Sequence, residues 1–405
     1  MRPALVALHR YVGLVMAGFL LIAGLTGSLL AWEHELDDMI NPALFRAEAP
    51  APGAALLDPL VLRERVMRQY PDARMPYAPL KVEEGRSVAF FLQAAQAAEL
   101  SNDEVFANPY TGAVQGERKW GDIRQGMKNV MPFIERLHYS LALGTAGTYA
   151  FGIVALLWSL DCFVGAFLTF PARMHRPAGR GVKASGTSWL ARWHTAWTVR
   201  WHGGSHKLNF DLHRAGGLWT WAMLFVLAWS GVSFNLVEVY EPVMKAVFAH
   251  QPGDEMLVTP ANARSEPGLA WDEAREVGQR LIAQLARAQG FTVIAETGLF
   301  HDSALGVYRY TVRSSRDLRE DGGLTTVVFD AGTGMQVGSW VPTGAASGDT
   351  IRSWISSLHM ATLWGRPFKA FMCVLGLLVA MLSVTGAVIW MQRRRAKAKV
   401  KARRA

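Results

Sequence analysis

Four long stretches without charge constrain this chain more than any other feature of its sequence. They cover residues 11–32, 140–172, 215–237 and 370–392, and Asp161 is the one charged residue within them. A helix that rises 1.5 Å per residue needs about 20 apolar residues to cross about 30 Å of hydrocarbon. The sequence therefore predicts a mainly α-helical membrane protein with four transmembrane helices. The first stretch is too long for a signal peptide and has no small-x-small cleavage site after it, so we expect it to be retained.

Basic residues are distributed unevenly between the segments that join these stretches. Residues 1–10, 173–214 and 393–405 hold 18 of the 42 lysines and arginines against one acidic residue, whereas the rest of the chain holds 24 basic and 32 acidic residues. Because short basic loops stay in the cytoplasm, both termini and the central loop are predicted to be cytoplasmic. The predicted membrane is the inner membrane of a bacterium, with two large segments in the periplasm.

This orientation gives a predicted division of the chain into eight parts. They are a cytoplasmic N-terminus with the first helix (1–32), a first periplasmic domain (33–139), a second helix (140–172), a basic cytoplasmic loop rich in Trp and His (173–214), a third helix (215–237), a second periplasmic domain (238–369), a fourth helix (370–392) and a basic cytoplasmic tail (393–405).

The sequence also contains a tandem duplication. The first and third stretches open with Leu-His-Arg-x-x-Gly-Leu, at His9 and His213, and each has a second glycine 18 residues after its histidine. The second and fourth stretches follow a Leu-His pair, at His138 and His359, with glycines 6 and 27 residues and an arginine 35 residues later. Agreement at this many offsets indicates two repeated units, each a helix, an outer domain and a helix.

The outer segments repeat as well. Each contains a helix-like stretch, at 60–69 and 272–288, followed by alternating β-branched and aromatic residues. A strand that runs into a turn comes next, at 105–112 and 328–334, where Asn-Pro and glycine supply the turn conformations. The sequence therefore predicts two small α+β domains.

Four of the eleven histidines occupy the repeated positions: His9, His138, His213 and His359. The first and third helices run in the same direction, so His9 and His213 are expected at one depth near the cytoplasmic face. His138 and His359 are likewise expected to share the periplasmic face. Two neutral imidazoles on facing helices of a bundle suit the two axial positions of a haem iron. The duplication thus predicts two haem groups, one at each face.

Basic residues at the rim of the bundle are candidates to bind haem propionates. They are Arg10 and Arg214 at one face, and Arg136 and Arg366 at the other. His34 follows the first helix without a repeat counterpart, and is a possible substitute ligand at the periplasmic face. A lone histidine at a helix end more commonly lies among lipid headgroups, so the prediction of ligation depends on the repetition.

Several other kinds of site are excluded by missing motifs. Without a CxxCH motif the chain cannot attach haem covalently. Cys162 and Cys373 both lie within apolar stretches, where neither a disulfide nor a four-ligand zinc site can be built from them. No Gly-x-Gly-x-x-Gly or Walker motif occurs, so electrons would come from quinol or from a cytoplasmic reductase. The clumped apolar composition also makes nucleic acid an unsuitable partner.

Asp161 lies deep within the second stretch, and its repeat equivalent is Leu382. A carboxylate at this depth costs about 2.5–3.5 kcal/mol on insertion scales, so we expect it to face the bundle interior. Two interpretations stay open, a proton relay or partner near a haem, and a hydrogen-bonded bystander.

The central loop carries tryptophans at four-residue spacing: Trp189, Trp193, Trp197 and Trp201. This spacing predicts an amphipathic helix at the membrane surface, in contact with lipid. Three histidines lie nearby, His194, His202 and His206, and an interfacial sequence explains them better than a metal site does.

Together these motifs resemble the PepSY-associated transmembrane proteins. The resemblance covers nearly the whole chain and includes Thr26-Gly27, the paired Leu-His openings, and Val384-Thr385-Gly386 followed by three arginines. The family includes siderophore-linked inner-membrane reductases of the FoxB type. The resemblance implies a di-haem b protein, with His9 paired with His213, His138 paired with His359, and two periplasmic PepSY-like domains.

The function that the resemblance implies is ferrisiderophore reduction. Electrons from the cytoplasmic side or from quinol would pass through both haem groups to a periplasmic ferric siderophore or other ferric chelate, and Fe³⁺ would be released as Fe²⁺. The alternative is a non-redox PepSY membrane protein that binds or regulates a periplasmic protein. The sequence identifies neither the chelate nor the electron donor.

Overall fold

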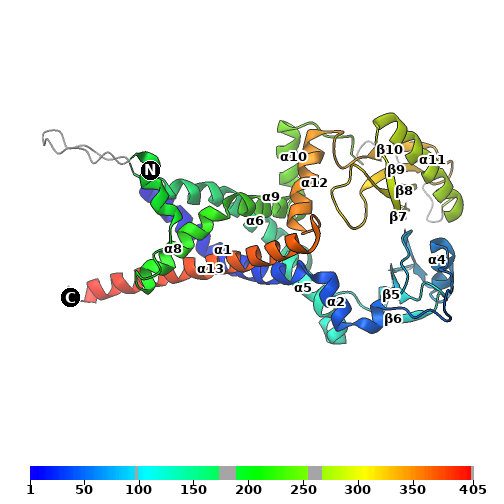
Figure 1. Ribbon diagram of the computed structural model, residues 1–405, viewed down its shortest axis with the longest axis horizontal. Coiled ribbons are helices and arrows are strands. Elements are labelled where there is room, and N and C mark those ends of the chain that lie inside the picture. The colour runs from blue at the N-terminus through cyan, green and yellow to red at the C-terminus, as the bar shows by residue number, and fades with distance from the viewer. Residues whose placement is uncertain (96–98, 173–187, 254–266, 403–405) are drawn as a thin grey trace. The chain divides into compact units, whose positions relative to one another are not determined.

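The computed structural model describes residues 1–95, 99–172, 188–253 and 267–402, and the chain forms two compact units (Figure 1). The first, here called the helical unit, comprises Met1–Ala31, Arg136–Glu241 and Pro367–Ala405. The second, the sheet unit, comprises Trp32–Glu135 and Pro242–Arg366. Each unit draws on both repeats.

Long apolar helices dominate the helical unit. They are α1 (Arg2–Leu30), α6 (Gly144–Thr169), α8 (Ser205–Trp219), α9 (Trp221–Asn235) and α13 (Gly365–Ala402). Among the described residues, α1, α6 and α13 are each long and apolar enough to cross a membrane, and α8 with α9 makes a fourth span if the bent pair counts as one.

The helix expected over 215–237 is divided at Thr220, where α8 and α9 meet at an angle of 71°. The Thr220 hydroxyl donates to the Gly216 carbonyl at 2.8 Å. Such a bond from a threonine to the carbonyl four residues earlier bends helices, and the backbone of Thr220 itself leaves the helical region, with φ −106° and ψ 2°. The apolar pattern continues through the bend, so the sequence does not reveal it.

The repeated histidines His138 and His359 lie on short helices of their own. These are α5 (Val130–Ser140) and α12 (Ser347–His359), and each precedes a long apolar helix. Gly144 and Gly365, six residues after the histidines, begin α6 and α13 with φ of 60° and 58°, a conformation that favours glycine. The second span therefore starts at Gly144, a few residues after the expected boundary at 140.

Small residues bring the long helices into close contact. A Cβ at Gly24 of α1 would lie 2.5 Å from the Gly376 carbonyl oxygen of α13, and Ser28 donates to the Cys373 carbonyl at 2.9 Å. On the other side of the bundle, a Cβ at Gly152 of α6 would lie 2.8 Å from the Asn235 carbonyl oxygen of α9. Packing through glycine and serine is the usual basis of helix association in membranes.

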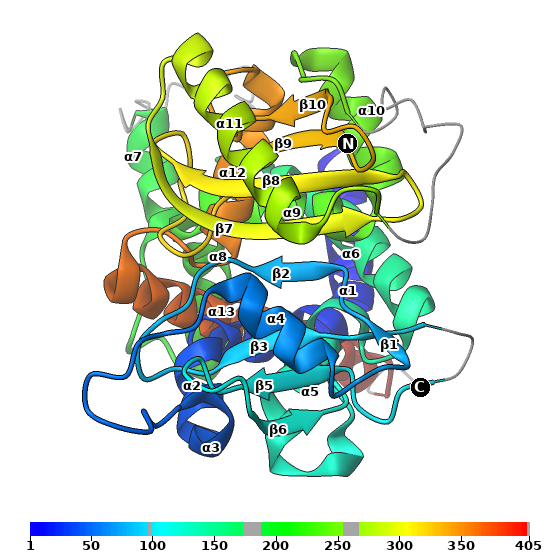
Figure 2. The ribbon, with the colours of Figure 1, turned by 90° about the vertical axis from the view of Figure 1, so that its right-hand side faces the viewer.

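Within its described residues, the sheet unit contains three antiparallel sheets (Figure 2). The largest has the order β10-β9-β8-β7-β2, the second β3-β5-β6, and the smallest β1-β4. The strands are β1 (Ala73–Arg74), β2 (Tyr77–Pro79), β3 (Val88–Phe91), β4 (Gln93–Ala94), β5 (Glu104–Ala107), β6 (Val114–Arg118), β7 (Val293–Asp302), β8 (Val307–Ser314), β9 (Thr325–Asp330) and β10 (Gln336–Trp340).

One helix covers each of the two larger sheets (Figure 2). The helix α11 (Trp271–Gln289) packs Leu281 and Ile282 into a core with Tyr308, Tyr310 and Phe329 of the five-stranded sheet. The helix α4 (Pro59–Met67) places Leu62 and Val66 in a second core with residues of β3 and β5. Both helices and both strand-turn segments were predicted from the sequence, and the structure confirms them.

The two outer segments share one sheet. Strand β2, from the first segment, pairs with β7 of the second, and Tyr77 lies opposite Phe300. The segments 33–139 and 238–369 therefore form one compact unit, although each keeps its own core. Pairing between strands so far apart in sequence leaves no local pattern, which is why separate domains were expected.

A buried ionic cluster joins α2 (Glu33–Ile40) to the sheet formed by β3, β5 and β6. Arg118 is 3% exposed and donates to Glu104 at 2.5 Å and to Asp37 at 2.9 Å. Beside it, the carboxyl groups of Glu33 and Glu135 are hydrogen-bonded, and burial together with the charge of Glu135 raises the pKa of Glu33 to about 8. The two carboxyls therefore hold a proton between them at neutral pH.

Candidate functional site: a pair of histidines in an apolar cavity

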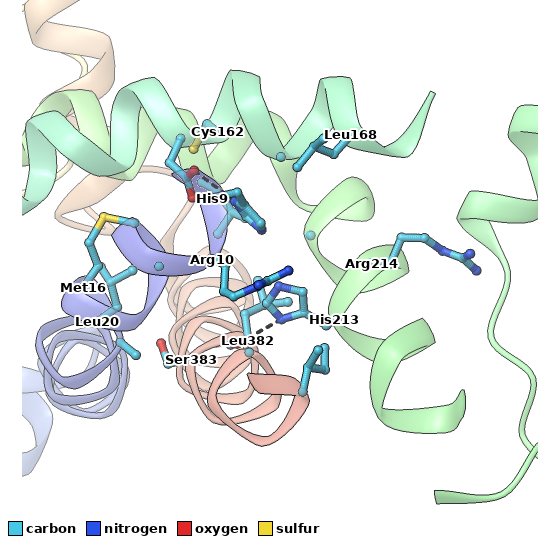
Figure 3. A pocket seen from close by; sticks show the side chains of 18 of the residues that line it. His9, Arg10, Met16, Leu20, Cys162, Leu168, His213, Arg214, Leu382 and Ser383 are labelled. Carbon is cyan, nitrogen blue, oxygen red and sulfur yellow. Dashed lines mark hydrogen bonds and ion pairs between the residues drawn. The ribbon is translucent and has the colours of Figure 1, made fainter. Parts of the chain in front are cut away.

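His9 of α1 and His213 of α8 lie together in the helical unit. Their ring centroids are 6.2 Å apart, and the ring planes make an angle of 58°. Both line a cavity of about 380 Å³ between α1, α6, α8, α9 and α13 (Figure 3). The structure therefore brings together the two histidines that the duplication relates.

The imidazole of His213 is held through Nδ1. This atom lies 3.1 Å from the Leu382 carbonyl oxygen and 3.0 Å from the Thr385 hydroxyl. Because the Thr385 hydroxyl donates its own hydrogen to the Met381 carbonyl, its oxygen acts as an acceptor toward the ring. Nδ1 of His213 must then carry the proton, which leaves the Nε2 lone pair available to a metal.

His9 is also protonated at Nδ1, but its hydrogen-bond partner is different. Its Nδ1 lies 2.9 Å from both carboxylate oxygens of Asp161, on α6. Asp161 is 9% exposed and faces the interior, as expected from its depth. A carboxylate accepts the Nδ1 proton, so Nε2 of His9 is also free to bind a metal.

His138 is held like His213. Its Nδ1 lies 2.9 Å from the Thr26 hydroxyl, which donates to the Ile22 carbonyl. A Cβ at Gly27 would lie 3.1 Å from the Cε1 of His138, so a larger residue would crowd the ring.

A second Thr-Gly pair, Thr385-Gly386, surrounds the ring of His213 in the same way. A Cβ at Gly386 would lie 3.1 Å from the Cε1 of His213. Threonine orients the ring and glycine admits it in both places. Sequence reasoning identified these dipeptides as motifs without assigning this role. The sequence feature that could have indicated this role is a hydroxyl residue directly before a repeated glycine. The same feature occurs once more, as Ser230-Gly231.

The other predicted ligands are distributed over the two units. His138 and Arg136 belong to the helical unit, whereas His359 and Arg366 belong to the sheet unit, so the pairing of His138 with His359 stays a prediction. His34 lies on α2 of the sheet unit with an exposed side chain.

The histidine pair fits the axial positions of a haem iron. Two metal–imidazole bonds of about 2.0 Å on opposite sides of one ion, with the ring radius added at each end, place the ring centroids about 6 Å apart. One or two protein ligands are enough for a haem iron. Such a site therefore needs no larger cluster, and in the described part of the chain no three His, Cys, Asp or Glu side chains gather as a metal site.

Two equivalent glycines keep space open beside the histidines. Gly13 and Gly217 follow His9 and His213 by four residues, which places each on the same helix face as its histidine. Both line the cavity, and a Cβ at either position would meet no atom within 4 Å. The empty space lies next to the imidazoles, where a flat macrocycle would need it.

Both predicted propionate partners, Arg10 and Arg214, line this cavity, and Arg214 already has an acidic partner. Arg214 donates to the carboxylate of Asp211 and to the Thr195 carbonyl, and Figure 3 shows it pointing away from His9 and His213. Arg10 and Arg393 also line the cavity, and neither forms an ion pair within the described ranges of the chain. Arg393 was not among the predicted site residues, since it lies in a run of three arginines.

The tryptophan-rich segment is only partly helical. The helix α7 (Trp189–His194) and the turn η3 (Thr195–Trp197) bring three tryptophans into contact, with successive ring centroids 5.4 and 5.3 Å apart. Trp201 lies beyond the helix, so the long amphipathic helix expected here was wrong. Residues 173–187 of the predicted loop lie outside the described residues.

The chain matches a known protein family. The model of the PepSY-associated TM region matches residues 6–393, from within α1 to within α13. No curated protein matches the sequence. The protein therefore belongs to the family defined by the PepSY-associated transmembrane region.

Proposed function

We propose that this protein is a haem-b electron conduit of the bacterial inner membrane that reduces periplasmic ferric siderophores or other ferric chelates. The observation that carries the proposal is the pair His9 and His213, with both Nδ1 atoms anchored and both Nε2 atoms free in an apolar cavity. Haem bound there supplies one-electron chemistry between Fe³⁺ and Fe²⁺.

The residues around the cavity would hold the group and keep it dry. His9 and His213 would hold the haem iron, and Arg10 and Arg393 would pair with the propionates. Gly13 and Gly217 leave space for the macrocycle, and the apolar walls limit the access of water and so help to set the potential.

A second haem is proposed between His138 and His359, with Arg136 and Arg366 as propionate partners. The Thr26-Gly27 contact to His138 supports this role, because it repeats the contact that holds His213. In the orientation expected from the basic segments, this second site would be at the periplasmic face.

Electron transfer is sufficient for the proposed reaction. Ferric iron prefers hard oxygen ligands, and one electron converts it to Fe²⁺, which those ligands bind less tightly. The electron would enter from quinol or from a cytoplasmic reductase, and the chelate itself stays intact. The chain therefore needs no residue that makes or breaks a covalent bond.

Haem content and optical spectra of the purified protein test this proposal. We expect a reducible b-type spectrum with two haems per chain, one lost in His9→Ala and in His213→Ala, and the other in His138→Ala. His206→Ala is the matched control, since His206 is exposed on the same helix as His213. A folded but colourless protein would refute the proposal and favour the non-redox alternative.

The direction of transfer needs oriented vesicles. Haem reduced from the cytoplasmic side should be reoxidised by a membrane-impermeant ferric hydroxamate siderophore on the periplasmic side. Reoxidation only by chelate on the cytoplasmic side would contradict the proposed orientation.

A further inference from the structure

The two histidines of the cavity are equivalent in the repeat, but their anchors differ in charge. His213 donates to a carbonyl and a hydroxyl, both neutral, whereas His9 donates to the carboxylate of Asp161. At the position of Thr385 the first repeat has Val164, which cannot accept a hydrogen bond. The hydroxyl has thus been replaced by a carboxylate one turn earlier in the helix.

The carboxylate is unusual in its surroundings. Among the described residues that line the cavity, Asp161 is the one acidic side chain. Its exposure of 9% and its place inside an apolar span make it costly to insert. Since the second repeat orients its histidine with neutral groups, orientation of the ring alone does not require a charge.

What a carboxylate adds is electron donation. A hydrogen bond to an ionised acceptor is roughly twice as strong as one between neutral groups. By drawing the Nδ1 proton toward itself, the carboxylate raises the basicity of Nε2, the atom that would bind iron. A stronger donor and a nearby negative charge both favour Fe³⁺ over Fe²⁺.

We propose that Asp161 is a positioning residue that polarises His9 and thereby lowers the reduction potential of the haem held by His9 and His213. The proposal rests on the proposed function and deepens it. The site at His138, where Thr26 is a neutral anchor, then has the higher potential. Electrons would run downhill from the first site to the second, which is the outward direction.

The repeat itself supplies the experiment. In Asp161→Leu/Val164→Thr the first repeat acquires the residues of the second, with a hydroxyl available to His9 in place of the carboxylate. Asp161→Asn keeps an acceptor oxygen but removes the charge, and Val164→Thr alone is the control that retains Asp161. The midpoint potentials of both haems are measured by redox titration of each purified full-length protein, together with haem content.

We expect both Asp161 variants to keep two haems and to raise one midpoint potential, while the control leaves both unchanged. A tenfold loss of the preference for Fe³⁺ corresponds to about 59 mV in a one-electron couple. The second haem serves as an internal reference in the same titration.

Three results would overturn the proposal. An unchanged or lower potential in Asp161→Asn with haem retained would show that the charge has no such effect. Loss of haem from Asp161→Asn and from the double variant would make Asp161 a requirement for binding. A shift of both potentials together would indicate a general electrostatic effect. Absence of haem from the unmodified protein would instead refute the proposed function.

Discussion

Gly13→Leu should close the proposed haem site without harming the fold. Gly13 lines the cavity, and no atom lies within 4 Å of the place where its Cβ would stand. The leucine side chain is therefore expected to extend into the space beside His9, where it would compete with a bound group.

The substitution should leave the stability of the haem-free protein unchanged or higher, but should lower its affinity for haem. Glycine within a helix is about 0.8–1.0 kcal/mol less favourable than alanine, and leucine ranks close to alanine, so the haem-free protein should be no less stable than before. Forcing extra methylene groups into a filled site costs about 1–3 kcal/mol. Haem affinity should accordingly fall about 5- to 150-fold.

The assay is haem titration of the haem-free protein, with a thermal melt of the same sample. Gly18→Leu is the matched control, because Gly18 lies on the same helix, also has no atom within 4 Å, and is absent from the cavity lining. The control should gain stability and keep its haem affinity. Full affinity in Gly13→Leu would show that haem does not use this space.

Two further predictions concern the sheet unit. Arg118→Leu should destabilise it by about 3–5 kcal/mol, because Glu104 and Asp37 lose their buried partner, and hydrogen exchange of the β5 and β6 amides would measure the loss. Glu33 ionises near pH 4.5 when unfolded but near 8 when folded, so stability should fall as the pH rises from 4.5 to 8. The melting temperature of Glu33→Gln should fall less between pH 4.5 and 8 than that of the unmodified protein. If both melting temperatures fell equally with pH, Glu33 and Glu135 would share no proton.

The duplication made the histidine pair predictable. The repeated offsets identified His9 and His213, and the bundle brings them together because α1 and α8 carry them at equivalent places. The partner of Asp161 could not be predicted, since its depth in the membrane shows that it faces inward but not which helix it meets. The ion pair of Arg214 was foreseeable, since Asp211 lies three residues earlier on the same helix.

The breaks in the helices were hidden for a different reason. The bend at Thr220 arises from a side-chain hydrogen bond inside an apolar run, and tryptophans on both sides preserve the apolar pattern. The turn before α6 uses Leu141 and Ala142 at φ of 52° and 56°, which their residue types do not favour. Tertiary packing determines where such bends and turns occur. The sequence therefore predicts the existence of the spans better than the positions of their ends.

The sharing of one sheet by two distant segments has a consequence for biosynthesis. Phe300, the partner of Tyr77, leaves the ribosome about 220 residues later, a delay of about 10–45 s at ~5–20 residues per second. During this time β2 lacks its neighbour and exposes unpaired backbone groups, which invite pairing with other chains. The nascent protein must therefore be shielded after its first segment emerges, and a version truncated before β7 should be a target for proteases.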